Sequence, residues 1–538
     1  MTVQTSRRIF WINVHSHAPQ FTIWQRRALY AGKLSVLNPI SYLKLSMLVE
    51  QKWTRLEALA TKSPLSLTRP VTTHPERAIE RQTPLRNFPA CKAAVRYAAR
   101  YVLKTDVARF YHSIYTHSIP WVIHGKATAK KNRSLNLWGN MLDKLIRDSQ
   151  DGQTMGIPIG PDLSLLIAEM LLSAVDQELV NRKGVRGLRY IDDYELSFNT
   201  LADAERVRGV LQELLSNYEL ALNSAKTSIR KLPLQLQEPW ISELAYFNLR
   251  TRQRGQHTDL LRYFDRAFEL AAAHPSEGVL KYAVGKAANL DVRPENRIFF
   301  QDLLLQCAAV EPGCLPMILR VLCRFRTHEV AARATLKGIP SERREQFLEA
   351  LRKLRKKTEA TEDSSGSEEE LTIEANIIDI AKLEMTFNAI IQSHAPQGHS
   401  SEVCWALWGC ILFGVKVLRE SADALIAMND PVVALLGLHA QERDLLPRKD
   451  YLKSFDQFLT AQDLYGEHWI LAYEANIKGW LRSPAGGDNV ASDPLFSILK
   501  TNGVAFYDES KVEDAFVQAA EAISEDEAEE PETAEGYF

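Results

Sequence analysis

Hydrophobic and polar positions follow different periods along the chain and divide it into regions. Residues 1–240 mix helical stretches with short runs of strand-like alternation, which predicts a domain of both α and β structure. Residues 241–356 repeat apolar side chains mostly at spacings of three and four, and prolines break the stretch into helices of about 10–18 residues. Residues 373–523 show helical spacing again. The pattern therefore predicts an α+β domain followed by an all-α domain.

Two acidic segments interrupt and end this pattern. Residues 357–372 (KTEATEDSSGSEEELT) are of low complexity and rich in Ser and Glu, which predicts a disordered linker or surface loop. Residues 524–538 are an acidic stretch that ends in Gly536-Tyr537-Phe538. We expect this second segment to be a flexible tail.

The overall composition is that of a globular protein. Hydrophobic residues make up 46 % and charged residues 25 %, which excludes wholesale disorder. The six cysteines contain no Cys-x-x-Cys pair, which argues against a thiolate zinc site and favours a reduced, cytoplasmic protein. The amino terminus lacks an apolar signal segment, and the longest apolar run, residues 403–415, is too short to cross a bilayer. We expect a buried helix there and no membrane partner.

The net charge of −2 conceals a strong asymmetry. Residues 1–100 carry 16 Lys and Arg against four Glu and no Asp, whereas residues 359–374 and 525–535 each carry seven acids and no base. A basic body with acidic segments favours a polyanionic partner, and nucleic acid is the commonest one. A basic face that serves only solubility is the alternative.

One short string suggests chemistry. Short alternating runs flank Asp192-Asp193 within Arg189-Tyr190-Ile191-Asp192-Asp193-Tyr194, which predicts a β-hairpin with both acids at its turn. Adjacent carboxylates repel one another unless a cation neutralises them, and Mg²⁺ takes such hard oxygen ligands. A solvated turn is the simpler reading, since Asp favours turns.

A second acid strengthens the argument for a metal site. Asp106 follows the apolar run 101–103 and precedes a helical pattern, so we expect it near the end of a strand. Two-metal nucleotidyl transfer needs carboxylates from separate strands. Asp106 could instead cap the following helix.

These strings resemble the palm and fingers of reverse transcriptases. Four blocks occur in the family's order: Thr105-Asp106-Val107-Ala108-Arg109-Phe110-Tyr111, Gly156-Ile157-Pro158-Ile159-Gly160-Pro161, Tyr190-Ile191-Asp192-Asp193 and Leu222-Asn223-Ser224-Ala225-Lys226-Thr227. The resemblance implies an RNA-directed DNA polymerase, or DNA nucleotidyltransferase, that uses dNTPs and a two-ion Mg²⁺ site, with Mn²⁺ as the substitute ion.

A subgroup resemblance extends this picture. Residues 110–121, with His124-Gly125-Lys126, resemble bacterial abortive-infection and other defence-associated reverse transcriptases, and Asn38-Pro39-Ile40 opening a helix resembles their fingers. The helical region after residue 240 resembles the HEAT-like α-repeat domain of that group. This implies anti-phage defence, a DNA product, bound RNA as template or scaffold, and a homo-oligomer, either a trimer or a hexamer.

The resemblance also assigns individual residues. It gives the metal ions to Asp106, Val107, Asp192 and Asp193, and places Lys226 at the leaving pyrophosphate. Tyr111 would lie under the sugar and reject a 2′-hydroxyl, with Phe110, Pro158 and Ile159 beside the nucleotide. Arg77 is the candidate clamp of the triphosphate, in competition with Arg69, Arg81 and Arg86.

One departure from the family pattern affects the expected reaction. Ile159 stands where retroviral and intron enzymes usually carry a Gln that helps to position nucleotide and template. The same change recurs in the defence-associated group, and that resemblance implies synthesis without a template or from a protein hydroxyl, for which Tyr537 is a candidate. An RNA-templated enzyme that reads a cognate non-coding RNA, of retron or intron type, is the alternative. A palm that only binds RNA as a scaffold is the non-enzymatic alternative.

Overall fold

The computed structural model describes residues 36–72, 78–248, 250, 253–275, 277–333, 378–484, 486–512 and 515. These residues fall into two compact units that meet in the sequence between Pro239 and Trp240. Arg77, Tyr537 and the two acidic segments, 357–372 and 524–538, lie outside the described residues. Each unit is described by itself.

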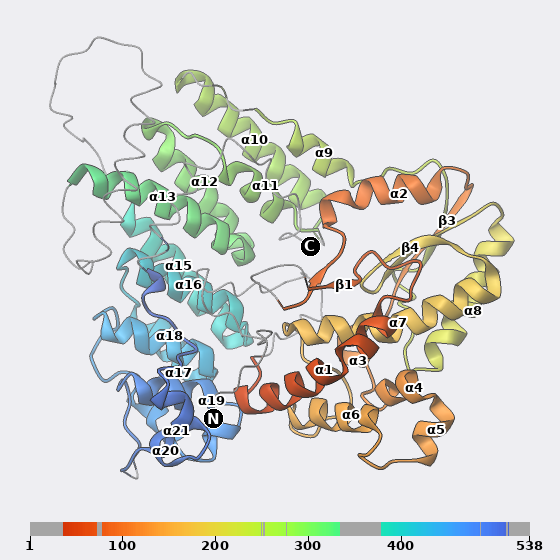
Figure 1. Cartoon of the computed structure of the whole chain (residues 1–538). Helices are drawn as coiled ribbons and strands as arrows, with labels where there is room; N and C mark the ends of the chain where they lie inside the picture. Colours follow the sequence, from red (N-terminus) through yellow and green to blue (C-terminus); the bar gives the residue numbers. More distant parts are fainter. Residues whose placement is uncertain are drawn as a thin grey trace. The chain divides into compact units, whose positions relative to one another are not determined.

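The first unit is built on a four-stranded antiparallel sheet (Figure 1). Its strand order is β4-β5-β3-β6, so β3 lies in the middle although it comes first in the chain. The strands are β3 (Tyr101–Asp106), β4 (Arg186–Tyr190), β5 (Asp193–Phe198) and β6 (Ser228–Lys231). A separate pair, β1 (Pro70–Val71) and β2 (Glu80–Arg81), precedes them.

Helices surround this sheet on both faces. The helices of the first unit are α1 (Pro39–Ala60), α2 (Phe88–Arg96), α3 (Phe110–Ser113), α4 (Ser118–His124), α5 (Lys126–Lys131), α6 (Trp138–Asp148), α7 (Asp162–Lys183) and α8 (Leu201–Ser216), with a 3-10 turn, η1, at Leu85–Asn87. The helix expected to open at Asn38-Pro39 begins at Pro39, where the Asn38 side chain accepts a hydrogen bond from the Ile40 amide at 3.1 Å.

The two faces of the sheet carry different side chains. Tyr194, Leu196 and Phe198 of β5 point into the hydrophobic core with α7 and α8. The intervening Glu195 points to the opposite face, where Arg96 of α2 donates to its carboxylate at 2.5 Å. Every second residue of β5, beginning with Asp193, therefore belongs to the α2 face.

The second unit consists of helices in the part of the chain that the structure describes. They are α9 (Pro239–Ala245), α10 (Gln253–Ala273), α11 (Val279–Ala288), α12 (Pro294–Val310), α13 (Leu315–Arg333), α15 (Ile380–His394), α16 (Ser400–Phe413), α17 (Arg419–Met428), α18 (Pro431–Glu442), α19 (Trp469–Ile477), α20 (Asn489–Ser492) and α21 (Phe496–Thr501), with 3-10 turns η2 (Pro312–Cys314), η3 (Ala395–Gln397), η4 (Lys453–Phe458) and η5 (Asp463–Tyr465). No described residue of this unit lies in a strand.

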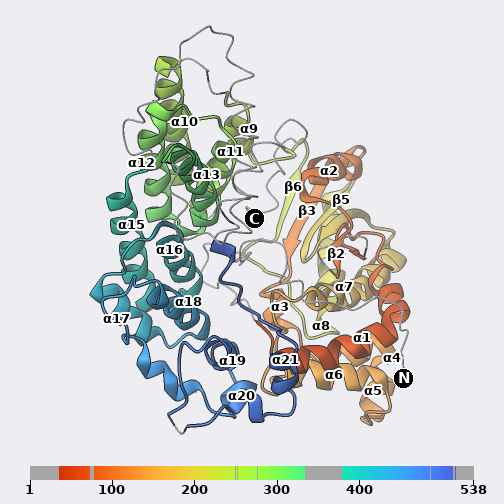
Figure 2. The same cartoon turned by 60° about the vertical axis from the view of Figure 1, so that its left-hand side comes forward.

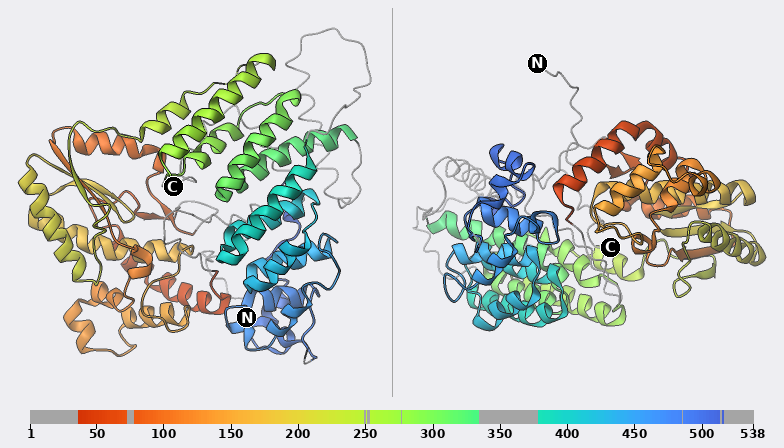
Figure 3. Two further views of the ribbon diagram at one scale, coloured as in Figure 1. Left: turned by 180° about the vertical axis from the view of Figure 1, so that it is seen from behind. Right: turned by 90° about the horizontal axis from the view of Figure 1, so that it is seen from below.

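These helices stack in chain order. Figures 2 and 3 show α10 to α13, then α15 and α16, then α17 and α18 lying side by side. The expected buried helix is confirmed as α16, in which every residue from Glu402 to Phe413 is buried. None of the described helices is long and apolar enough to cross a membrane.

Candidate active site

The predicted hairpin around the acid pair is confirmed. β4 and β5 pair with Tyr190 opposite Asp193, so Ile191 and Asp192 form the turn and Asp193 begins β5. Ile191 has a φ of +54°, a left-handed conformation that is costly for a β-branched residue. The turn is therefore held in a strained backbone geometry by its surroundings.

The sheet brings the third acid to this hairpin. β3 pairs with β5 so that Asp106 lies directly opposite Asp193. Directly opposite residues of an antiparallel pair project from the same face, so both side chains project beside each other on the α2 face. The Val107 amide also donates to the Asp192 carbonyl at 3.2 Å, which joins the end of β3 to the turn. Asp106 ends a strand and does not cap a helix, since α3 begins only at Phe110.

Asp106 has an incompletely satisfied carboxylate. The residue is 4 % exposed; Lys226 donates to its Oδ2 at 2.9 Å, while its Oδ1 is buried and has no hydrogen-bond partner. A buried oxygen without a partner carries a desolvation cost that a bound cation would remove. The Asp106 carboxylate thus fits a divalent cation.

Lys226 is a half-exposed lysine in a turn after α8. The amides of Lys226 and Thr227 both donate to the Asn223 carbonyl, at 3.2 and 3.0 Å, and the Asn223 amide donates to the Asp106 carbonyl at 2.9 Å. The side chain of Lys226 is 51 % exposed. The turn therefore places the half-exposed Lys226 ammonium group against Asp106.

Tyr111 lies within the electrostatic reach of this acid cluster. Burial raises the pKa of its hydroxyl well above the ordinary value, and the negative charge of Asp192 raises it further. The Tyr111 ring lies 5.4 Å from that of Phe110, which is 3 % exposed and packs in the core. Phe110 is thus a support for Tyr111, while Tyr111 is the one placed toward the acids.

The glycine-proline loop is tied to the helix that carries Tyr111. The Ile157 amide donates to the Tyr111 carbonyl at 2.9 Å, and the Gly156 amide donates to the Ile114 carbonyl at 2.8 Å. Gly156 has a φ of +85°, and a Cβ there would lie 3.2 Å from the His112 carbonyl oxygen. A side chain there would be strained by the left-handed backbone and crowded against this oxygen, which favours glycine. Pro158 and Ile159, both half-buried, follow directly.

Arg77 lies outside the described residues, and of the other arginines considered for the triphosphate Arg81 contacts the hairpin. Its guanidinium donates to the Tyr190 hydroxyl at 2.7 Å, and its positive charge lowers the pKa of Tyr111 against the larger opposing effects. Arg69 instead donates to the Ser63 carbonyl, at 2.6 and 3.1 Å. The described chain therefore places Arg81 at Tyr190, which pairs with Asp193, and the sequence did not rank this arginine above the others.

A buried ionic network under the hairpin was not predicted. Arg189 of β4 and the carboxylates of Glu169 and Asp176, both on α7, are completely buried. The guanidinium donates to Glu169 at 2.9 and 3.0 Å and to Asp176 at 2.7 Å. Burial opposes the positive charge, yet Asp176 and Glu169 outweigh it and hold the pKa of Arg189 well above its ordinary value.

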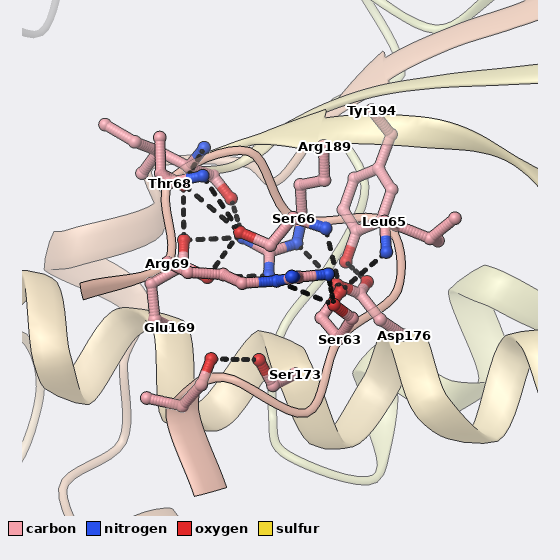
Figure 4. Close-up of polar contacts among 12 residues, drawn as sticks. Ser63, Leu65, Ser66, Thr68, Arg69, Glu169, Ser173, Asp176, Arg189 and Tyr194 are labelled. Atoms are coloured by element: carbon pink, nitrogen blue, oxygen red, sulfur yellow. Dashed lines mark hydrogen bonds and ion pairs between the residues drawn. The ribbon is translucent and has the colours of Figure 1, made fainter. Parts of the chain in front are cut away.

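Hydroxyl groups complete the network. The Ser63 and Tyr194 hydroxyls donate to Asp176 at 2.5 and 2.7 Å, and those of Ser66 and Thr68 donate to Glu169 at 2.7 and 2.5 Å. Figure 4 shows these side chains gathered around Arg189. Burial raises the pKa of Asp176, although the charge of Arg189 acts in the opposite direction. Two acids thus share one base, with four hydroxyl donors satisfying the remaining lone pairs.

This network holds the strained turn directly. Arg189 donates to the Ile191 carbonyl at 2.6 Å, and the Ile191 amide donates to the Thr68 hydroxyl at 3.0 Å. The carbonyl and the amide of Ile191 are therefore both held by hydrogen bonds to residues of the buried network. Glu169 and Asp176 are seven residues apart, which places them on one side of a helix, and that spacing is the signal that sequence reasoning could have used.

Comparison with known proteins is consistent with this geometry. Residues 49–247 match the family model for reverse transcriptase (RNA-dependent DNA polymerase). No curated protein matches the chain. The matched segment contains all the described candidate residues of the acid cluster, the Tyr111 helix, the glycine-proline loop and the Lys226 turn. Residues 49–247 are therefore a reverse transcriptase domain, and its activity class is that of an RNA-directed DNA polymerase.

Proposed function

We propose that this protein is a Mg²⁺-dependent DNA polymerase of the reverse transcriptase type that acts in bacterial anti-phage defence. The observation that carries the polymerase part is the pairing of Asp106 with Asp193 across two strands, next to Asp192, with one buried Asp106 oxygen left without a partner. The defence part rests on the resemblance of residues 110–121 to defence-associated enzymes.

The acid cluster would hold the ions through Asp106, Asp192, Asp193 and the main-chain oxygen of Val107. Mg²⁺ bound there supplies activation of the attacking hydroxyl and neutralisation of the leaving pyrophosphate. A chelator should therefore abolish incorporation of labelled dNTPs, and added Mg²⁺ or Mn²⁺ should restore it. Incorporation that persists in excess chelator would contradict the proposal.

Lys226 and Arg81 serve the triphosphate in this proposal. Lys226 pairs with Asp106, and once a cation neutralises that carboxylate its half-exposed ammonium becomes available to phosphate oxygens. Arg81 lies at Tyr190 with a guanidinium fork suited to phosphate. Both side chains would place a positive charge near the negatively charged pyrophosphate that leaves in the reaction.

Tyr111→Val is expected to admit ribonucleotides. Removing the ring opens space where a 2′-hydroxyl would otherwise clash, so the preference for dATP over ATP should fall by at least about ten-fold. Relative incorporation of the two nucleotides measures this. Tyr97→Val is the matched control, because Tyr97 is 77 % exposed and outside the acid cluster. An unchanged preference in Tyr111→Val would assign Tyr111 to packing alone.

Ile159 supports synthesis that does not depend on a template. Its aliphatic side chain offers no hydrogen bond to a template base or an incoming nucleotide, yet it sits on the loop tied to Tyr111. Sequencing the product made with and without the copurified RNA tests this point. A product that copies that RNA would support the templated alternative, with a cognate non-coding RNA as template.

Priming from the chain's own Tyr537 completes the proposal for initiation. The 15 residues after Ile523 carry seven acids and include Tyr537. A fully extended segment of 15 residues reaches about 50 Å, which is long enough to bring a tyrosine hydroxyl to a distant site. Truncation after Ile523 should remove a nucleotide adduct that mass spectrometry detects on Tyr537 of nuclease-trimmed full-length protein. Undiminished protein-linked DNA in the truncated chain would contradict this role, and tighter nucleic-acid binding by that chain would instead indicate that the tail mimics nucleic acid.

The helical second unit is proposed to be a HEAT-like repeat that supports a homo-oligomer. Its helices pack successively in chain order, as repeat units do. Light scattering coupled to gel filtration would distinguish a trimer or hexamer from a monomer.

A further inference from the structure

Three potential metal ligands converge at the turn between α15 and α16 in the second unit. His394 ends α15, His399 immediately precedes α16, and Glu402 lies in the first turn of α16. One ligand atom from each residue lies within 4.8 Å of those of the other two. Within the part of the chain that the structure describes, no other set of three or more His, Cys, Asp or Glu side chains brings its ligand atoms this close together. It belongs to the helical unit and not to the polymerase domain.

Two of these side chains have buried atoms without partners. Glu402 is 4 % exposed, and its Oε2 makes no hydrogen bond; the Nδ1 of His399 is also buried and makes none. Burial raises the pKa of Glu402 to about 7. Native proteins satisfy nearly all buried polar atoms, so two unsatisfied ones in adjacent side chains point to a missing partner.

The third ligand is oriented by its hydrogen bonds. The Nδ1 of His394 lies 3.0 Å from the Ile390 carbonyl, which can only accept, so Nδ1 is the protonated nitrogen. The Ser393 hydroxyl, 2.8 Å away, donates to the Ala389 carbonyl and can accept from the same N–H. Nε2 of His394 therefore carries the lone pair, and a second nitrogen bonded to a carbonyl is the usual arrangement around a metal-binding histidine.

We propose that His394, His399 and Glu402 bind a divalent transition-metal ion of the Zn²⁺ type. Two imidazoles and one carboxylate are a ligand set that suits such ions and leaves a fourth position for water. Ligand atoms at about 2.0–2.1 Å from a tetrahedral ion lie about 3.3 Å apart, so binding draws the three side chains together by up to about 1.5 Å. Side-chain rotation supplies a movement of this size.

Such an ion would fasten the helix pair at its turn. His394 and Glu402 belong to successive helices, which Figure 2 shows side by side, and Gly398 reverses the chain between them with a φ of +69°. The ion would therefore have a structural role, because it would join the end of α15 to the start of α16. The competing partner for Glu402 is the ammonium of Lys281 on α11, whose charge acts on this carboxylate.

Zn²⁺ binding to the full-length protein tests the proposal. The protein is stripped with a chelator and titrated with Zn²⁺ in a large excess of Mg²⁺, which keeps the aspartates of the polymerase domain occupied. We expect one tightly held Zn²⁺ per chain by elemental analysis after gel filtration, and a higher thermal midpoint. Co²⁺ at the same site should give the visible absorption bands of a tetrahedral ion.

Matched variants locate the ion. His399→Ala and Glu402→Gln should each lower the bound Zn²⁺ by at least ten-fold and remove the Co²⁺ bands, whereas the exposed His257→Ala and Glu442→Gln should change neither. Glu402→Gln preserves side-chain size, and circular dichroism verifies that it folds. No stoichiometric Zn²⁺ in the parent, or full binding by both site variants, would overturn the proposal. Lys281→Met is then added to each site variant. If both site variants lose Zn²⁺ while the parent holds it, and Lys281→Met restores binding in neither, Lys281 is excluded as the partner of Glu402 and the metal site is supported.

Discussion

Replacing both acids of the hairpin, Asp192→Asn with Asp193→Asn, is expected to lower nucleotide incorporation by at least about a thousand-fold. The two substitutions remove two negative charges from the metal site and leave Asp106 as the only carboxylate of the acid cluster. Stability should stay constant or rise, because like charges at one turn repel each other and their loss is favourable. Incorporation of labelled dNTPs and the thermal midpoint together measure this. If the proposed defence function holds, phage protection in plated cells is lost together with activity.

A matched control separates chemistry from folding. Asp148→Asn removes an exposed aspartate from the surface pair with Lys144 at the end of α6 and should leave incorporation unchanged. Asp106→Asn should be inactive as well, although Lys226 can still donate to its amide oxygen. Primer extension by the double variant at a rate near that of the parent would contradict the assignment of the acids.

The parts of the site that are formed by residues next to each other in the sequence could be predicted. Tyr190-Ile191-Asp192-Asp193 is a turn between alternating runs, and hairpin pairing is a local property. The prolines predicted to divide residues 241–356 include Pro275, and α10 ends at Ala273, two residues before it. That helix has 21 residues and exceeds the expected range of about 10–18, because nothing within it stops helical propagation.

The parts that depend on packing between distant elements could not be predicted. Arg189, Glu169 and Asp176 are charged residues that normally lie at the surface, and their burial is known only when α7 is placed beneath β4. Arg81 reaches Tyr190 across 109 positions of the chain. His394, His399 and Glu402 lie within nine residues, but the turn that makes them converge depends on how α15 and α16 pack.

The second large effect is expected from Arg189→Met. The substitution leaves Glu169 and Asp176 buried without their cation, so the free energy of unfolding should fall by about 3–5 kcal/mol. The Ile191 carbonyl also loses its donor, so the strained turn should relax and the acid pair should move. Denaturant unfolding measures the first effect, and the Mg²⁺ concentration for half-maximal incorporation measures the second. We expect that concentration to rise in any Arg189→Met protein that remains folded.

A compensated variant distinguishes positioning from stability. Arg189→Met with Glu169→Gln and Asp176→Asn removes the unpaired charges and should recover much of the lost free energy of unfolding. It cannot restore the bond from the guanidinium to Ile191, so its Mg²⁺ requirement should remain raised. Arg186→Met is the control, because Arg186 lies on the same strand with its guanidinium over the Tyr97 ring, outside the network. If the compensated variant recovered both stability and the parental Mg²⁺ requirement, Arg189 would only neutralise the two acids. If stability alone returned, the network would be what positions Asp192 and Asp193, because the turn they occupy is the element that Arg189 and Thr68 hold.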